Sequence, residues 1–326
     1  MRILVTGAAG FIGSHLVEAL LRDNHVVCGV DNLNVGRMEN LEQATKSEFF
    51  SFHKIDITSK TGLNSIQGDF EIVLHLAALA DIVPSIENPE SYFQTNVNGT
   101  FNVMEYAKNF GVKKVVYIAS SSCYGIPERY PTDESAPIAP KYPYALTKYL
   151  GECIAMHWSQ VYGIPTTSLR FFNIYGPRAR TSGTYGAVFG VFLAQKLANQ
   201  PFTIVGDGNQ TRDFTYVTDA VDAIVTAMKS SRVGIFNVGS GNTYSINMLV
   251  ELLEGATVHI PKRPGEPDST FADIRKIEAE LGWTPKVSFE EGVDRVLREI
   301  DYWRGAPLWN PDSIKAATKT WFEFLS

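Results

Sequence analysis

Three side chains near the middle of the chain have the types and spacing of a site for proton transfer. Tyr144 and Lys148 lie four positions apart, so on a helix they share one face and the ammonium can sit beside the phenol. A free phenol has a pKa of about 10, and a neighbouring positive charge lowers that pKa by stabilising the phenolate. The hydroxyl of Ser120 can hydrogen-bond an alcohol oxygen and orient it. This set predicts Tyr144 as a base for a sugar or alcohol hydroxyl, and a surface Tyr–Lys pair is the alternative.

Strands and helices that could position these residues follow from the pattern of apolar residues. Ser120 comes directly after an apolar run at 115–119, which fits a buried parallel strand, and Tyr144 and Lys148 fall in a helical pattern over 143–162. Further strand-like runs alternate with helical stretches such as 89–110; the runs lie at 3–5, 25–31, 49–55, 72–78 and 167–172. This alternation predicts an α/β fold with a doubly wound parallel sheet, the Rossmann arrangement.

The first strand leads into a glycine-rich turn and a helix. Gly7, Gly10 and Gly13 follow the apolar run at 3–5, and apolar residues then recur at helical spacing. Gly7 would permit a tight turn, Gly10 would let a pyrophosphate approach the backbone, and Gly13 would let the helix sit close to the sheet. The spacing differs from the usual Gly-x-Gly-x-x-Gly and is weak evidence alone. With the flanking strand and helix it predicts a nucleotide site at a helix N-terminus.

Two carboxylates follow the next two strands. Asp31 ends the second strand, eighteen residues after Gly13, where it can accept hydrogen bonds from an adenosine ribose and repel a 2′-phosphate. Asp56 is placed to accept from an adenine amino group, with a helix N-cap as the alternative. A solvated aspartate is the alternative for Asp31, and Arg37 nearby could receive a phosphate. We therefore predict NAD, whose oxidised nicotinamide would add positive charge near Tyr144.

Composition excludes several other functions. The chain of 326 residues carries a formal net charge of −6, so no basic field is available for nucleic acid. The three cysteines and six histidines show no metal-type spacing, and we predict no metal site. No stretch is long enough to span a bilayer, and the N-terminal strand leaves no room for a signal peptide. We therefore expect no membrane partner and a cytoplasmic protein.

The regular alternation of strands and helices ends near residue 172, after which Pro and Gly become frequent and the strands shorten. We predict a NAD-binding Rossmann domain at 1–172 with a returning segment at 214–238, a smaller α/β substrate-binding domain at 173–213 and 239–300, and an aromatic C-terminal extension at 301–326. The substrate is expected in the cleft between the domains, at the carboxyl ends of the strands.

Taken together, the glycine turn, Asp31, Asp56, Ser120 and the Tyr144–Lys148 pair resemble the extended short-chain dehydrogenase/reductase family. Within this family the chain is similar to nucleotide-sugar epimerases of the UDP-glucose/UDP-galactose 4-epimerase type. The resemblance covers residues 1–300 and includes further segments at 96–99, 170–177, 206–213 and 263–266. It implies that Asn173 holds a phosphate, that Arg212 and Arg263 clamp the pyrophosphate, and that Glu266 accepts from the nucleotide ribose.

The predicted site residues are taken from these motifs and this resemblance. Those predicted to bind the cofactor are Gly7, Gly10, Phe11, Ile12, Gly13, Asp31, Asn32, Asp56, Ile57, Leu76, Ala77, Ala78, Asn96, Tyr144, Lys148 and Phe171. Those predicted to bind the substrate are Ser121, Ser122, Asn173, Arg212, Arg263, Glu266 and Thr270. Arginine guanidinium groups suit a diphosphate, and a surface or inter-domain ion pair is the alternative for each arginine.

Departures from the family pattern narrow the reaction. Related 4,6-dehydratases place an Asp-Glu pair where this chain has Ser121-Ser122, and UDP-glucuronate decarboxylases carry a Glu at the place of Ser122. Without this acid the resemblance implies a 4-epimerase, which oxidises C4 to a 4-keto sugar and returns the hydride from bound NAD. It also implies that the position seven residues after Arg263 gates the sugar pocket. This position is Thr270, whose small side chain predicts that UDP-N-acetylhexosamines fit.

Other functions on the same fold stay open at this point. They are a 4,6-dehydratase, a UDP-glucuronate epimerase or decarboxylase, a GDP- or CDP-sugar epimerase, and a non-enzymatic NAD-binding protein, against which the intact Ser120–Tyr144–Lys148 set argues. The helices at 89–110 and 143–162 match the family's dimer bundle, so we expect a homodimer. The aromatic extension is expected to pack against the body, with a cover on the substrate domain or a subunit contact as alternatives.

Overall fold

The computed structural model describes residues 1–179 and 187–325, and its largest element is a parallel sheet of seven strands. The order across the sheet is β11-β6-β5-β4-β1-β2-β3, with every neighbouring pair parallel. Its strands are β1 (Arg2–Thr6), β2 (Val26–Asp31), β3 (Phe50–Lys54), β4 (Ile72–His75), β5 (Lys114–Ser120), β6 (Thr166–Phe171) and β11 (Gly234–Val238). The strand order reverses at β1 and β4, so the predicted doubly wound Rossmann fold is confirmed.

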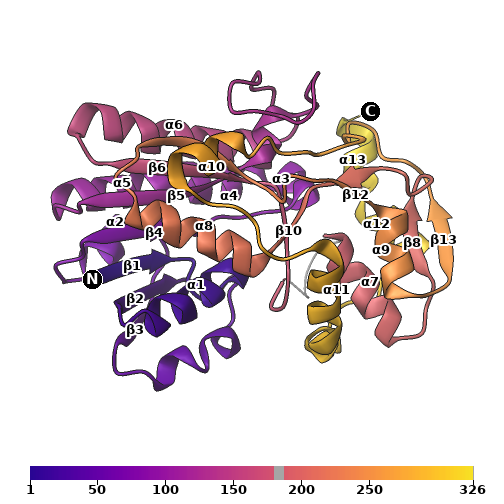
Figure 1. The fold of residues 1–326 in the computed structure, drawn as a ribbon, viewed down its shortest axis with the longest axis horizontal. Helices are drawn as coiled ribbons and strands as arrows, with labels where there is room; N and C mark the ends of the chain where they lie inside the picture. Colours follow the sequence, from indigo (N-terminus) through magenta and orange to yellow (C-terminus); the bar gives the residue numbers. More distant parts are fainter. Residues whose placement is uncertain (180–186, 326) are drawn as a thin grey trace.

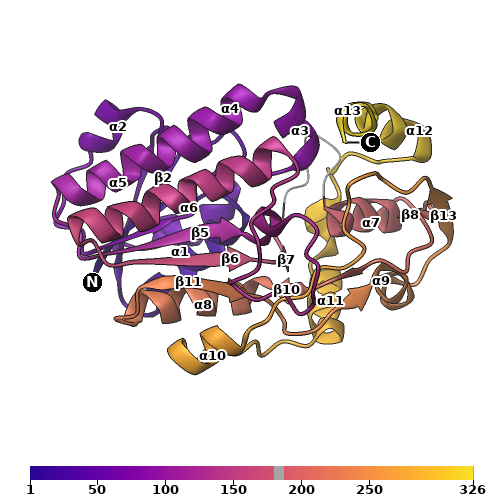
Figure 2. The same cartoon turned by 90° about the horizontal axis from the view of Figure 1, so that it is seen from above.

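Helices cover both faces of this sheet (Figure 1, Figure 2). On one face, α1 (Phe11–Arg22) and α8 (Val217–Lys229) bury apolar residues against the strands. On the other, α2 (Lys60–Asn64), α5 (Thr100–Asn109) and α6 (Pro143–Tyr162) enclose a second apolar core. Strands buried on both faces explain the continuous apolar runs in the sequence.

Two predicted elements differ in detail from those observed. The helix at 89–110 is helical along its length but divides into α4 (Pro89–Phe93), a π-helix η3 (Gln94–Gly99) and α5. The strand predicted at 72–78 ends at His75. The Leu76 N–H still donates to the Thr6 carbonyl at 3.1 Å, but the Ala77 N–H donates to the Thr6 side-chain Oγ1 at 3.2 Å, so main-chain pairing with β1 ends there.

The rest of the chain folds into shorter elements beside the carboxyl ends of the large sheet (Figure 1). Its strand pairs are β7 (Asn173–Tyr175) with β10 (Phe214–Tyr216), β8 (Phe202–Val205) with β13 (Thr257–Ile260), and β9 (Thr211–Arg212) with β12 (Tyr244–Ser245). Its main helices are α7 (Val188–Leu197), α9 (Ile246–Leu253) and α11 (Phe289–Arg298). Stacked and edge-on aromatic rings fill the core between them; they include Tyr175, Phe189, Phe214 and Phe289.

Two segments from the second half of the chain pack on the large sheet. The returning segment contains α8 and β11, and β11 extends the large sheet beside β6. However, α10 (Arg275–Leu281), predicted in the substrate-binding domain, packs on β11, and Lys276 Nζ donates to the Ile235 carbonyl at 2.9 Å. Buried Ile277 in this helix accounts for the packing, since it joins the apolar core of the sheet. The remaining division stays a prediction.

The C-terminal segment forms short helices on the outside of the smaller part. They are η5 (Ile300–Trp303), α12 (Pro311–Ala317) and α13 (Lys319–Phe324). Asn310 and Ser313 cap α12 through reciprocal hydrogen bonds between side chains and backbone N–H groups. Within residues 1–179 and 187–325, no helix combines the length and apolar character that crossing a membrane requires.

Candidate active site

Ser120 and Tyr144 meet where β5 ends against α6. Ser120 is the last residue of β5, and Pro143 at the first turn of α6 starts the helix so that Tyr144 lies beside the strand end. The Ser120 hydroxyl lies near enough to the Tyr144 phenol to interact with it, and this interaction acts to lower the pKa of Tyr144. It also accepts from the Ser122 backbone N–H at 3.2 Å and lies 2.8 Å from the Ser122 hydroxyl. The strand end therefore presents neutral hydroxyls to the phenol.

The pKa of Tyr144 departs from the expected direction. Burial raises the pKa of Tyr144, and it outweighs the opposing interaction with Ser120. Lys148 points to the strand, where its Nζ donates to the Ile118 carbonyl at 2.5 Å. Burial lowers the pKa of Lys148 to about 7, while the nearby Glu152 carboxylate raises it. The predicted lowering of the Tyr144 pKa relied on Lys148 together with an oxidised nicotinamide, and it stays a prediction; within the protein alone, burial dominates.

Asn96 holds the segment after β4 against the catalytic helix. Its Oδ1 accepts from the Leu79 N–H at 2.8 Å, and its Nδ2 donates to the Leu79 carbonyl and to Thr147 Oγ1. The side chain is 1% exposed, so these contacts use its hydrogen-bonding groups inside the protein. That Asn96 binds the cofactor stays a prediction; its side chain fixes Leu79, in the loop that contains Ala77 and Ala78.

The glycine turn brings three segments into close contact. Gly7 has φ +72°, and a Cβ there would lie 2.7 Å from the backbone nitrogen of Ala77. A Cβ at Gly13 would lie 2.0 Å from the Gly7 carbonyl oxygen, so α1 can approach the turn this closely only with glycine at this position. Gly10 is the N-cap of α1 and supplies no side-chain cap. The first N–H groups of α1, which include those of Phe11 and Ile12, therefore suit an anionic group.

Carboxylates occupy the ends of β2 and β3. Asp31 accepts from the Ala9 and Leu33 N–H groups at 3.0 and 2.8 Å, yet burial raises its pKa. Asn32 Nδ2 donates to Asp56 Oδ2 at 2.8 Å, and Thr58 donates to the other Asp56 oxygen. Each carboxylate has lone pairs left for a ligand hydroxyl or amino group.

The structure bears on three further predicted residues: Asp56, Ile57 and Phe171. Ser59, and not Asp56, is the N-cap of α2, which removes the capping role considered for Asp56. Ile57 is buried in the core, and its carbonyl accepts from Asn102 at 3.0 Å. Phe171, at the end of β6, is also buried, 5% exposed, within the sheet's core. Any contact of these residues with a cofactor would therefore involve limited side-chain surface.

An arginine cluster lies in the smaller part of the molecule. Arg212 Nη2 donates to Glu266 Oε1 at 2.7 Å, and Arg263 Nη1 lies 3.7 Å from Glu266 Oε2. The side chains of Arg212 and Arg263 are 10% and 11% exposed, so both charges are largely withdrawn from solvent. A cavity of about 250 Å³ is lined by residues that include Gly206, Gln210, Arg212, Lys262 and Glu266. Its walls therefore carry both positive and negative groups.

Thr270 and Asn173 are joined beside this cluster. Thr270 Oγ1 donates to Asn173 Oδ1 at 2.7 Å and accepts from the Asp213 N–H at 3.1 Å. Asp213 is fully buried and accepts from the backbone N–H groups of Ser240 and Ala272. Thus the residue predicted to gate the sugar pocket and the residue predicted to hold a phosphate share a hydrogen bond.

Tyr142 connects the two groups of residues and was missed in the sequence. Its ring is parallel to that of Tyr144, with a centroid separation of 6.4 Å. Burial raises the pKa of Tyr142; the nearby Glu266 charge adds to this rise and the nearby Arg212 charge opposes it. Tyr142 therefore lies between the Ser120–Tyr144 pair and the arginine cluster. The sequence offered one signal for a role of Tyr142: it lies directly before Pro143, and the predicted catalytic Tyr144 lies directly after it.

Two other neighbours of Tyr144 were also missed. Tyr92 packs the edge of its ring against Tyr144 at 6.4 Å and donates its hydroxyl to the Ala80 carbonyl. Asp81, the next residue, has φ +79° and carries a negative charge that acts to raise the pKa of Tyr144. A non-glycine residue at this φ is uncommon and is a backbone feature often associated with functional sites.

Among the described residues, no cluster of potential metal ligands is found.

Comparisons with known proteins agree with this geometry. A family model described as GDP-mannose 4,6 dehydratase matches residues 4–296. A putative UDP-glucose 4-epimerase of Methanocaldococcus jannaschii is 39% identical over 303 residues, which cover 90% of this chain and 97% of that protein.

Solved structures show the same similarity in three dimensions. UDP-glucose 4-epimerase from Thermotoga maritima, solved with UDP-glucose, has a TM-score of 0.87 at 34% identity, covering 94% of this chain and 99% of that one. UDP-glucuronic acid 4-epimerase from Bacillus cereus, solved with UDP-glucuronic acid and NAD, has a TM-score of 0.84 at 32% identity, covering 92% and 99%. The similarity therefore extends over both parts of the molecule.

Proposed function

This chain belongs to the extended short-chain dehydrogenase/reductase family of nucleotide-sugar enzymes, and we propose that it is a 4-epimerase of UDP-hexoses. Its cofactor is NAD, which when bound accepts a hydride from C4 of the sugar and returns it. The observation that carries the proposal is the contact between Ser120 and Tyr144 at the end of β5, where the following residues are neutral serines.

In this reaction the residues of the chain handle the proton of the sugar O4 hydroxyl. The Tyr144 phenolate takes the O4 proton as C4 becomes a ketone, and gives it back when the C4–H bond re-forms on the other face. The Ser120 hydroxyl donates to O4 and orients it. Lys148 lies one turn further along α6, and the oxidised cofactor, when bound, would supply the positive charge that offsets the rise in the Tyr144 pKa caused by burial.

The residues of the Rossmann part fit the proposed dinucleotide. The uncapped N-terminus of α1 and the turn at Gly7 suit its pyrophosphate. Asp31 and Asp56 suit the hydroxyl and amino groups of its adenosine, since each carboxylate has acceptor capacity left. A carboxylate at Asp31 disfavours a 2′-phosphate, which supports NAD over NADP.

The neutral Ser121 and Ser122 favour epimerisation over dehydration, because they offer no acid to expel the 6-hydroxyl. A specific observation supports 4,6-dehydration as the second candidate. Asp81 lies close enough to Tyr144 to act on its pKa, and in this candidate reaction it would supply the acid. Epimerisation leaves the mass of the sugar unchanged, whereas dehydration removes water.

We assign the UDP-sugar to the smaller part of the molecule. Arg212 and Arg263 would bind the diphosphate, Asn173 a phosphate oxygen, and Glu266 the nucleotide ribose. The hexose would then span from this cluster to Tyr144, past Tyr142. The small side chain of Thr270 supports N-acetylated hexoses among the substrates.

The test is product analysis by mass spectrometry and proton NMR after incubation of the purified protein with UDP-glucose, UDP-N-acetylglucosamine and UDP-glucuronate, separately and without added NAD. An isomer of equal mass with inverted C4 is expected. Loss of water would instead favour dehydration, and Asp81→Asn should then abolish it. If UDP-N-acetylglucosamine fails to react while UDP-glucose turns over, the proposed role of Thr270 is wrong.

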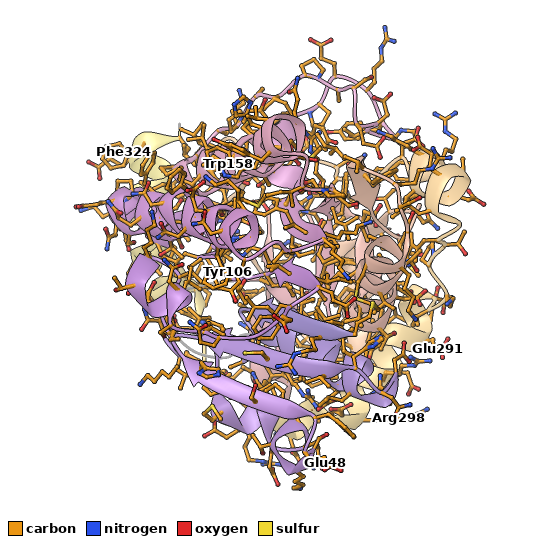
Figure 3. The ribbon with its side chains drawn as sticks, turned by 90° about the vertical axis from the view of Figure 1, so that its left-hand side faces the viewer. Glu48, Tyr106, Trp158, Glu291, Arg298 and Phe324 are labelled. Atoms are coloured by element: carbon orange, nitrogen blue, oxygen red, sulfur yellow. The ribbon has the colours of Figure 1, made fainter. Side chains whose placement is uncertain are left out.

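We also propose a homodimer and a cytoplasmic location. The outer surface of α5 and α6 exposes apolar side chains, among them Phe101, Leu146 and Val161 at 39%, 45% and 54%. Trp158, labelled in Figure 3, lies on the same helical layer and contacts the Phe101 ring at 5.4 Å. Light scattering after gel filtration tests the proposal: a monomeric mass at micromolar concentration would contradict it.

A further inference from the structure

The C-terminal helix α13 contacts the loop that contains Arg263. Trp321 is 5% exposed, and its indole N–H donates to the Pro264 carbonyl at 2.7 Å. Gly265 follows with φ +69°, and a Cβ there would lie 3.5 Å from the backbone oxygen of Leu325. The loop at 263–266 is therefore packed along α13, which belongs to the part of the chain whose role the sequence left open.

Trp321 also contacts the guanidinium of Arg263. The guanidinium carbon lies 5.4 Å from the centroid of the indole ring, within the range of a cation–π interaction. Glu266 Oε2 lies 3.7 Å from Arg263 Nη1 and itself pairs with Arg212 through its other oxygen. Arg263 thus has an aromatic face and a carboxylate as neighbours, and its orientation relative to Arg212 depends on both.

The same helix reaches the Rossmann part of the molecule. α13 packs against α3 (Ile82–Glu87), and Thr320 Oγ1 donates to Glu87 Oε1 at 3.4 Å. Figure 2 shows α13 next to α3, at the end of the helical layer that contains α6. Since α3 follows the loop that Asn96 holds against α6, α13 links the arginine cluster to the elements around Tyr144.

We propose that Trp321 is a positioning residue for the substrate diphosphate, holding Arg263 in the orientation in which it pairs with the phosphates alongside Arg212. This inference rests on the proposed function, since it takes Arg263 as a diphosphate ligand. A guanidinium held against an aromatic ring loses less side-chain freedom when an anion binds, so the contact increases affinity without touching the reacting atoms. The contact should therefore affect binding of the nucleotide and leave the hydride and proton steps unchanged.

The experiment measures UDP affinity by calorimetry on the purified, NAD-containing protein and compares it with kcat and KM. Trp321→Leu, which fills the site without an aromatic face, should weaken UDP about tenfold and raise KM in step, with kcat within about twofold. Trp321→Phe keeps a ring and should weaken UDP only about threefold. Arg263→Lys keeps the charge but loses the flat guanidinium, and should weaken UDP as much as Trp321→Leu.

Two controls separate positioning from general stability. Phe324→Ala, on the same helix but 65% exposed and at the outer edge of the molecule (Figure 3), should leave UDP affinity unchanged. Trp321→Leu should cause no further loss in an Arg263→Ala background, because the contact it removes is already gone. A purely structural tryptophan would weaken UDP equally in both backgrounds.

Each outcome decides between the proposals. The inference on Trp321 alone is overturned if UDP affinity is unchanged in Trp321→Leu or in Arg263→Lys. It is also overturned if the losses of affinity in the double variant are additive. If Trp321→Leu does not fold, Arg263→Lys and Trp321→Phe carry the test. A wild-type protein that binds UDP tightly but inverts no UDP-sugar contradicts the proposed reaction and leaves the positioning role standing. If it binds none of UDP, GDP and dTDP, both proposals fall.

Discussion

The two parts of the candidate site are built in different ways. In the Rossmann part, Ser120, Asp31 and the glycine turn sit at strand ends, where the main-chain hydrogen bonds of a parallel sheet fix them. In the smaller part, side chains from distant segments hold one another: Arg212 binds Glu266 across 54 positions, and Thr270 binds Asn173 across 97. In the sheet, the backbone fixes the position of each residue independently of the other site residues. In the arginine cluster, the position of each side chain depends on the other side chains. Substitutions should therefore have separable effects in the first part and coupled effects in the second.

The largest expected effect comes from removing the phenol of Tyr144. Tyr144→Phe should lower kcat by roughly 10²- to 10⁴-fold, because proton transfer to O4 is lost. The bound NAD and the unfolding temperature should stay as in the wild type, since backbone and ring packing keep the position of residue 144. Turnover measures kcat, the absorbance of bound cofactor measures the NAD content, and a thermal melt gives the unfolding temperature. A rate within tenfold of the wild type would show that another group is the base.

Buried and partly exposed ion pairs give the next contrast. Glu152 accepts from Arg170 at 2.6 Å with both side chains at most 4% exposed, and it also accepts from Ser168. Glu152→Gln should therefore destabilise the fold by about 3–5 kcal/mol, because the arginine charge stays buried without its partner.

Glu266→Gln makes the same change in the arginine cluster, where Glu266 is 23% exposed. It should cost about 1–3 kcal/mol of stability, because Arg212 and Arg263 are largely withdrawn from solvent, and it should also raise KM for the nucleotide sugar. Urea unfolding of the two variants, with KM for Glu266→Gln, measures the difference. Equal losses of stability would mean that the cluster is as rigidly built as the Rossmann part.

A pH effect of intermediate size is expected from Asp213. Burial raises the pKa of Asp213 to about 6, above the 3.8 of a free aspartate, although backbone N–H groups of Ser240 and Ala272 oppose the rise. The folded state thus holds an extra proton between these values, and the free energy of unfolding should fall by about 2–3 kcal/mol as pH rises through that window. Below the lower value and above the upper one, this contribution is constant.

Asp213→Asn is the matched control for that pH effect, because the amide has the same shape and does not titrate. It keeps one oxygen acceptor and loses the other, so it should be less stable than the protonated wild type by about 1–3 kcal/mol. The difference between the two proteins should narrow as pH rises from 4 to 6. Parallel unfolding curves against pH would show that Asp213 is already ionised throughout this range.

The same contrast explains which features of the fold and of the candidate site could be predicted from the sequence. The fold and the positions of Ser120, Tyr144 and Asp31 follow from apolar periodicity and local spacing, which a single segment reveals. The Arg212–Glu266 pair and the placement of Tyr142 depend on long-range packing that no local pattern encodes. The surroundings of Tyr144 could not be predicted for a related reason: spacing shows that Lys148 shares its face, but it shows neither the burial of the phenol nor the lysine's bond to the Ile118 carbonyl.

The smallest expected effect concerns the choice of sugar at Thr270. Thr270→Tyr should lower kcat/KM for UDP-N-acetylglucosamine at least about tenfold relative to UDP-glucose, since a bulky side chain takes the space of the acetamido group. The substitution also removes the hydroxyl that joins Asn173 and the Asp213 N–H. Thr270→Val separates the two causes, because it removes the hydroxyl at nearly equal volume. It should weaken both sugars alike, leaving their ratio unchanged; a shift in that ratio with valine would mean that hydrogen bonding, and not pocket size, selects the sugar.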